Sequence, residues 1–221
     1  MNYNKNHVLQ TLESTFSTFI DTVNHLDHLN PSQYTSDNTM IVMIDMINGF
    51  CKIGPLHSDF VNQMIPKMAR FLDTMIKKNI PVISYRDSHP ADAGEFDYFP
   101  PHCVEDSEES ELVSELQRTE LIDITKNSTN GFLAQNPIDL PIINKEHLEH
   151  ILVMGCVTDI CVRDFSTTMT KHLQEINHSA RVTVIENLVD TFHIEGSHDR
   201  ETEHLLALYH MQASGIKLVR V

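Results

Sequence analysis

The sequence has few basic residues and no long apolar run. Lysine and arginine together number 16 against 31 acidic residues, so the formal net charge of the 221 residues is −15 at pH 7. This balance argues against nucleic acid or an anionic membrane surface as the main partner. No stretch approaches the roughly 18 apolar residues that span a membrane. The first residues also lack the cationic and then apolar pattern of a secretion signal, so we expect no membrane partner.

Cysteine is scarce as well. There are only four cysteines, and a chain of 221 residues can bury a substantial core without a disulfide framework. Reduced thiols in the cytoplasm therefore fit best, and we expect a cytoplasmic protein. Hydrophobic residues make up 41% and charged residues 21% of the sequence, which is ordinary for a globular domain.

Apolar runs alternate with helical patterns after residue 39. The runs lie at 40–44, 81–85, 121–124, 151–154, 182–185 and 217–221, and helical patterns lie near 59–78, 159–173 and 200–213. Fully apolar strands separated by helices predict an α/β fold, with three α/β/α layers around a mostly parallel six-stranded sheet. An amphipathic helix between Val8 and Leu26 and a polar link precede it. We therefore expect an N-terminal helical extension (1–39) and one α/β domain (40–221).

Three chemically active side chains follow predicted strands. Asp45 ends the first strand, Lys126 ends the third, and Cys161 closes the turn Gly-Cys-Val-Thr-Asp-Ile-Cys at 155–161. Ligands of parallel sheets bind beyond the carboxyl ends of the strands, so these side chains share one rim. The start of a helix favours a thiolate at Cys161, although a buried structural cysteine is the alternative. An acid, a cation and a thiol are what a cysteine hydrolase needs.

A second group of polar side chains follows the second strand. Asp87 and His89 point the same way in an extended segment, and two prolines stiffen the approach to His102. Glu95 lies between them in the sequence. Two histidines and two carboxylates would suit a divalent transition metal with open positions for water or substrate.

The order of Asp45, Lys126 and Cys161, with the cysteine turn at 155–161, resembles the isochorismatase-like cysteine hydrolases. The resemblance extends from residue 40 to the C-terminus. It implies that Asp45 is the general base and acid, Lys126 the electrostatic partner and Cys161 the nucleophile. It also implies a cis peptide bond between Cys156 and Val157, with the N–H groups of Val157 and Cys161 holding the oxyanion.

Within that superfamily, Asp-Ser-His-Pro at 87–90 and Phe-Pro-Pro-His-Cys-Val at 99–104 resemble the nicotinamidases (pyrazinamidases), which bind a metal. Asp87, His89 and His102 match three ligands. Ala93 stands where many nicotinamidases have a second histidine, but Glu95 lies seven residues before His102, as in another branch. The resemblance thus implies one divalent ion, with zinc ahead of iron or manganese.

Two aromatic side chains, Phe50 and Phe99, match positions that flank the pyridine ring in this family, with ordinary core packing as the alternative. The acidic segment at 105–109 replaces the glycine-containing turn that the family usually has there. The N-terminal extension is also absent from typical members, and it caps the sheet edge or lies in an oligomer interface.

The leading hypothesis is a metal-dependent cysteine amidohydrolase that converts nicotinamide and water to nicotinate and ammonia through a thioester. The partner is then a small-molecule amide, and we expect a homo-oligomer. Another small amide, such as a carbamoyl or ureido compound, is the nearest alternative. Isochorismate is disfavoured by the Asp-x-His motif, and a catalytically silent α/β binding protein is the remaining alternative.

Overall fold

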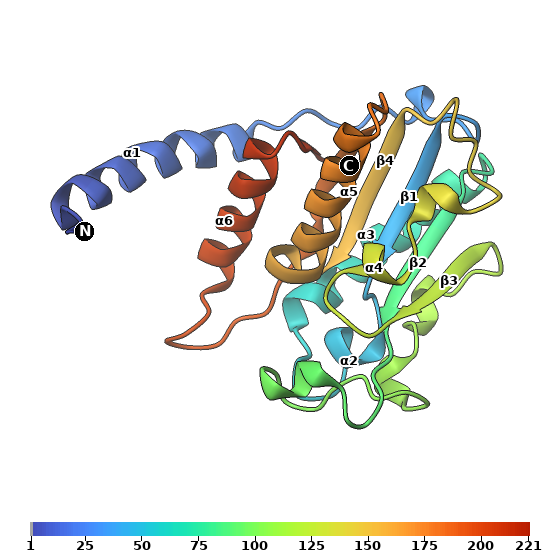
Figure 1. Cartoon of the computed structure of the whole chain (residues 1–221), viewed down its shortest axis with the longest axis horizontal. Coiled ribbons are helices and arrows are strands. Elements are labelled where there is room, and N and C mark those ends of the chain that lie inside the picture. The colour runs from blue at the N-terminus through green and yellow to red at the C-terminus, as the bar shows by residue number, and fades with distance from the viewer. Residues whose placement is uncertain (1) are drawn as a thin grey trace.

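A computed structural model of the chain, which describes residues 2–221, shows a parallel sheet between two layers of helices (Figure 1). The sheet has six strands in the order β3-β2-β1-β4-β5-β6, and every neighbouring pair is parallel. The strands are β1 (Thr39–Ile44), β2 (Val82–Asp87), β3 (Leu121–Lys126), β4 (His150–Cys156), β5 (Arg181–Asp190) and β6 (Lys217–Val219). The predicted α/β/α architecture is confirmed, and the sheet is parallel throughout.

The alternation of side chains along β1 divides the core in two. Ile41 and Met43 pack with α3 (Asp59–Ile76) on one face, whereas Met40 and Val42 pack with α5 (Arg163–Glu175) and α6 (Arg200–Ala213) on the other. All six β1 residues are buried, because helices cover both faces of the sheet. The helices are α1 (Lys5–Asn24), α2 (Asn48–Cys51), α3 (Asp59–Ile76), α4 (Gly131–Ala134), α5 (Arg163–Glu175) and α6 (Arg200–Ala213).

The N-terminal helix α1 joins the domain through its C-terminal half only. Phe19 and Val23 are buried, and the Phe19 ring meets the Tyr209 ring of α6 with centroids 5.3 Å apart. Figure 1 shows the first turns of α1 extending away from the sheet. Among residues 2–221, no helix combines the length and the apolar character needed to cross a membrane.

The cysteine turn departs from a regular helix start. Residues Thr158–Val162 form a π-helical turn, and α5 begins only at Arg163. Cys161 therefore lies in an irregular turn rather than in the first turn of an α-helix. Such turns are frequent at functional sites, because they turn side chains to positions that an α-helix does not offer.

One glycine decides how closely the two central strands approach each other. Gly155 has a φ of +124°, and a Cβ atom there would lie 2.0 Å from the carbonyl oxygen of Ile44. Any other residue would push β4 away from β1 at the point where Asp45 begins its turn. Gly155 thus keeps Cys156 and the cysteine turn next to Asp45, and the thiol of Cys156 donates to the Asp45 carbonyl oxygen at 3.0 Å.

The acidic segment at 105–111 contacts two other parts of the chain. It contains a short 3-10 turn, Glu108–Ser110, and the Glu109 carboxylate accepts the backbone N–H of Cys103 at 3.0 Å. Glu109 also contacts Gly54, where a Cβ would meet its carboxylate at 2.8 Å or less. The segment thereby ties the chain around His102 to the loop after α2.

Candidate active site

The carboxyl ends of three strands bring Asp45, Lys126 and Cys161 into contact. The Lys126 ammonium lies 2.8 Å from Asp45 Oδ2 and 3.9 Å from Cys161 Sγ. All three residues are at most 5% exposed. The parallel register explains the meeting, because Ile44 pairs with Gly155 and Asp87 pairs with Lys126, so the strands end level with one another. The arrangement offers a proton acceptor, a cation and a thiol at one point.

Lys126 also joins this group to the second one. Its ammonium contacts Asp87 Oδ1 at 2.5 Å and donates to the Ser128 carbonyl oxygen at 3.0 Å. Asp45 Oδ1 in turn accepts the backbone N–H of Asp87 at 2.9 Å. Burial alone would lower the pKa of Lys126, but Asp45 and Asp87 outweigh it and raise that pKa, so the ammonium stays charged.

Burial disfavours the charged forms of both Asp45 and Cys161. Burial, followed by the charge of Asp87, raises the pKa of Asp45 to about 7 against the opposing effect of Lys126. Burial also raises the pKa of Cys161, although Lys126 favours its thiolate. The sequence pattern favoured a thiolate stabilised at a helix start, and burial opposes that effect. A buried thiol needs a nearby proton acceptor to react as a thiolate, and the Asp45 carboxylate lies in the same group of contacts.

The peptide bond between Cys156 and Val157 is cis, as the family resemblance implied. Val157 begins the turn that ends at Cys161, and both residues line one pocket. This placement keeps the two N–H groups that we predicted to hold an oxyanion within one short turn beside the thiol.

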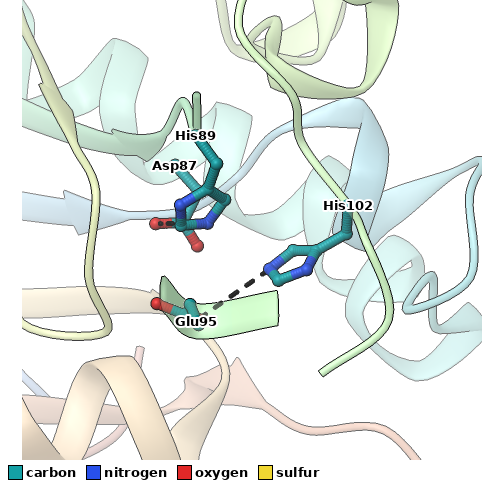
Figure 2. Close-up of side chains that lie close together, drawn as sticks. All are labelled: Asp87, His89, Glu95 and His102. Atoms are coloured by element: carbon teal, nitrogen blue, oxygen red, sulfur yellow. Dashed lines mark ion pairs between the residues drawn. The ribbon is translucent and has the colours of Figure 1, made fainter. Parts of the chain in front are cut away.

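Asp87, His89, Glu95 and His102 converge from β2 and the loops that follow it (Figure 2). One potential ligand atom of each lies within 4.8 Å of those of the others. His89 Nε2 is 3.6 Å from Asp87 Oδ1, and His102 Nε2 is 3.9 Å from Glu95 Oε1. The structure therefore brings together all four residues that the sequence pattern selected, including Glu95.

The surroundings of these side chains fit a divalent metal. His89 Nδ1 contacts Asn127 Oδ1, and His102 Nδ1 contacts the Pro100 carbonyl oxygen, each at 2.8 Å. These acceptors fix each ring with Nε2 free to bind a metal, as in many metal sites. His89 Nε2 and Asp87 Oδ2 are buried without a hydrogen-bond partner. Burial and the charge of Asp87 also raise the pKa of Glu95, which means that its carboxylate form is destabilised. A bound cation would stabilise that carboxylate.

A pocket connects the thiol with this cluster. It is lined by Phe50, Leu56, Asp87, Glu95, Phe99, His102, Thr129, Val157, Ile160, Cys161 and Phe192. The rings of Phe50 and Phe99 both lie near the His102 ring, with centroids 5.6 and 6.2 Å from it. Both predicted aromatic residues thus border the pocket, and Phe50 also belongs to a core cluster.

Sequence reasoning missed two contributors to the site. Asn127 directly follows Lys126 at a strand end, so its position could have drawn attention to it. Phe192 lies in the loop after β5 and reaches the pocket through tertiary packing alone. No local pattern in the sequence distinguishes Phe192 from the other phenylalanines.

The isochorismatase domain family matches residues 39–216 of the chain. Nicotinamidase 1 of Arabidopsis thaliana is 30% identical over 226 aligned positions, which cover 88% of this chain and 91% of the plant protein. The chain therefore belongs to the isochorismatase family, and its resemblance to the nicotinamidase subfamily is confirmed. It is an amidohydrolase by this relationship.

Solved structures show the same fold. A zinc complex of the pyrazinamidase of Pyrococcus horikoshii superimposes with a TM-score of 0.68 at 22% identity, covering 83% of this chain and 99% of that one. For a nicotinamidase/pyrazinamidase of Bacillus subtilis the TM-score is 0.66 at 21% identity, covering 83% and 100%. An N-carbamoylsarcosine amidase of Thermoplasma acidophilum gives 0.65 at 21%, covering 83% and 96%.

Proposed function

We propose that this chain hydrolyses nicotinamide to nicotinate and ammonia through a thioester on Cys161. The observation that carries the proposal is that one pocket is bordered by the thiol, by three aromatic rings and by three of the four potential metal ligands. A planar aromatic carboxamide matches this combination of side chains, because its ring needs apolar partners while its carboxamide and ring nitrogen need polar ones. The similarity to a plant nicotinamidase supports the same substrate.

In the first half of the reaction, Asp45 accepts the Cys161 proton as the sulfur forms a bond to the carboxamide carbon. Lys126, 3.9 Å from the sulfur, stabilises the negative charge that develops there. The N–H groups of Val157 and Cys161 bind the oxyanion, and each such donor typically contributes about 3 kcal/mol. The tetrahedral intermediate then expels the amine, which receives the proton from Asp45 and leaves as ammonia.

In the second half, Asp45 is again a carboxylate and accepts a proton from water. The water oxygen attacks the thioester carbon, the carbon–sulfur bond breaks, and the proton returns from Asp45 to the Cys161 sulfur. The products are nicotinic acid, which ionises, and the original thiol. The pKa of Asp45, about 7, suits a group that must both accept and donate a proton near neutral pH.

Asp87, His89, Glu95 and His102 would hold one divalent metal ion beside this pocket. Two nitrogen and two carboxylate donors suit zinc, and iron or manganese accept the same donors. When bound, the ion supplies a Lewis acid that can bind the pyridine nitrogen and so orient the substrate.

An ammonia-release screen tests the proposed function directly. Nicotinamide and pyrazinamide should both release ammonia, whereas a carbamoyl or ureido compound and simple aliphatic amides should react far more slowly. The screen is run with and without a chelator, on protein of known metal content. Turnover of a ureido compound but not of nicotinamide would replace the proposed substrate with that alternative class.

The acid limb of the pH profile should report Asp45. Below about pH 7 Asp45 is protonated and cannot accept the thiol proton, so kcat/KM for nicotinamide should fall about tenfold per pH unit. Steady-state rates between pH 5 and 8 measure this limb, with the metal content verified at each pH. A profile that stays level down to pH 5 would contradict the assignment of Asp45 as the base.

Metal content should follow the four proposed ligands. Protein purified without added metal should contain about one equivalent of zinc, iron or manganese, as measured by elemental analysis. Glu95→Gln removes a charged ligand and should lower the metal affinity at least tenfold, since even outer contacts of metal sites have effects of that size. Glu105→Gln, an exposed acid nearby, is the matched control and should leave affinity unchanged. Substoichiometric metal together with chelator-insensitive turnover would contradict the site.

Three wider proposals concern the setting of the enzyme. We propose a division into an N-terminal extension (1–39) and a catalytic domain (40–221), which the family match beginning at residue 39 supports.

We propose a homo-oligomer, supported by the exposed apolar residues Val8, Leu9 and Leu12 on the projecting part of α1. Light scattering on the full chain and on a Leu9→Glu variant measures the oligomeric state and so tests this proposal.

We also propose a cytoplasmic location, which the four free cysteines support.

A further inference from the structure

The loop between β5 and α6 contributes an aromatic wall to the pocket. This loop begins after Asp190 and ends at Asp199, and its Phe192 lines the pocket together with Val157, Ile160 and Cys161. The family resemblance assigns the aromatic positions Phe50 and Phe99, which lie on other elements, and it does not assign Phe192. The structure therefore holds a third aromatic ring at the site of the proposed reaction.

This loop makes contacts at its base and near its tip. At its base, the Arg200 guanidinium contacts Asp190 Oδ2 at 2.6 Å and donates to Oδ1 at 2.8 Å. Nearer its tip, Ile194 and His198 exchange two backbone hydrogen bonds, each of 2.9 Å. These contacts return the chain so that His198 faces Phe192.

His198 then links Phe192 to the cysteine turn. The two rings are stacked, with centroids 4.1 Å apart and planes at 23°. One ring nitrogen of His198, Nε2, lies 2.9 Å from Asp159 Oδ2, and the other, Nδ1, lies 3.1 Å from the Phe192 carbonyl oxygen. Asp159 belongs to the π-turn, two residues before Cys161, and is 7% exposed. Both ring nitrogens are thus engaged with protein oxygens.

We propose that Phe192 is a specificity-determining wall for the aromatic ring of the substrate, and that His198 is the positioning residue that fixes it relative to Cys161 through Asp159. This inference rests on the proposed function, since it concerns the ring of an aromatic carboxamide. A ring fixed by stacking on one face and by a hydrogen-bonded bridge loses little further freedom when a flat ligand packs beside it. The wall should therefore act mainly on substrate binding.

Kinetics on nicotinamide with matched variants test this inference. Phe192→Leu keeps an apolar side chain but removes the ring, and it should raise KM about tenfold with kcat changed less than about threefold. His198→Gln keeps a donor for Asp159 but removes the stacked ring, and it should raise KM about threefold. Ile194→Ala changes an exposed side chain of the same loop and should leave both constants unchanged. Metal content and melting temperature of every variant verify the folded, loaded protein.

The double variant Phe192→Leu/His198→Gln separates positioning from independent effects. If His198 acts through Phe192, the double variant should have the KM of Phe192→Leu alone, because nothing remains to be positioned. A KM that is the product of the two single effects would overturn the positioning role. An unchanged KM in Phe192→Leu would overturn the wall.

Failure of the proposed function gives a different result. A wild-type enzyme that hydrolyses aliphatic or ureido amides and no aromatic carboxamide overturns the proposed function and the wall together. A wild-type enzyme that hydrolyses nicotinamide, with Phe192→Leu unaltered in KM, overturns the wall alone.

Discussion

Cys161→Ala should abolish ammonia release from nicotinamide, with a loss of at least about 10⁴-fold in kcat. The sulfur forms the covalent bond in the proposed mechanism, and removal of a covalent nucleophile typically leaves only the small catalysis that binding and oxyanion donors supply. The variant should still bind nicotinamide, because Cys161 is one of several residues that border the pocket. Coupled assays for ammonia and calorimetric titration with nicotinamide measure the two quantities.

The matched control for this variant is Cys51→Ala. Cys51 is also buried and free, but it is the last residue of α2, packs in a core cluster and has no part in the proposed chemistry. It should retain activity within a few-fold while it loses some stability from the missing sulfur. Ammonia release by Cys161→Ala at the wild-type rate would exclude a thioester mechanism.

Lys126→Met should destabilise the protein and inactivate it. Lys126 is 2% exposed and is the ammonium that lies between the buried carboxylates Asp45 and Asp87. Without it, the buried Asp45 and Asp87 carboxyl groups lose their shared cation, and breaking a buried ion pair in this way typically costs about 3–5 kcal/mol. The thiolate of Cys161 would also lose its nearby cation. Chemical denaturation of the metal-free protein measures the loss in free energy of unfolding.

Two further variants make this result specific. Adding Asp45→Asn to Lys126→Met should restore part of the lost stability, because one uncompensated carboxylate is removed, but it should restore no activity. Lys52→Met removes an ion pair with Glu115 that is partly exposed, and it should cost no more than about 1 kcal/mol. Equal losses in Lys52→Met and Lys126→Met would contradict the role of burial in this network.

The positions of Asp45 and Lys126 could be predicted from the sequence because an apolar strand has a recognisable end. In a parallel sheet all carboxyl ends meet at one edge, so residues that follow different strands become neighbours whatever their separation in the sequence. The same rule placed Cys161 and Asp87 at this edge. Observed contacts between 2.5 and 3.9 Å agree with that expectation. The roles of these residues stay predictions until the variants are measured.

Other properties of the site depend on contacts that no local pattern encodes. The sequence favoured a thiolate at Cys161, whereas burial raises the pKa of this group. Burial is the sum of packing from β1, β3, β4 and the loops, so it emerges only when these segments are assembled. The wall formed by Phe192 has the same origin, since it requires His198 to fold back on it.

The sequence by itself thus determined the layered α/β architecture, the membership of the cysteine turn in the site and the four converging metal-ligand candidates, because strand periodicity and residue spacing are local properties. Only the tertiary structure decided the burial of the thiol, the bridge from Lys126 to Asp87 and the third aromatic ring of the pocket at Phe192. Each of these depends on desolvation or on side-chain contacts between segments far apart in the chain, and such terms are set by the assembled fold.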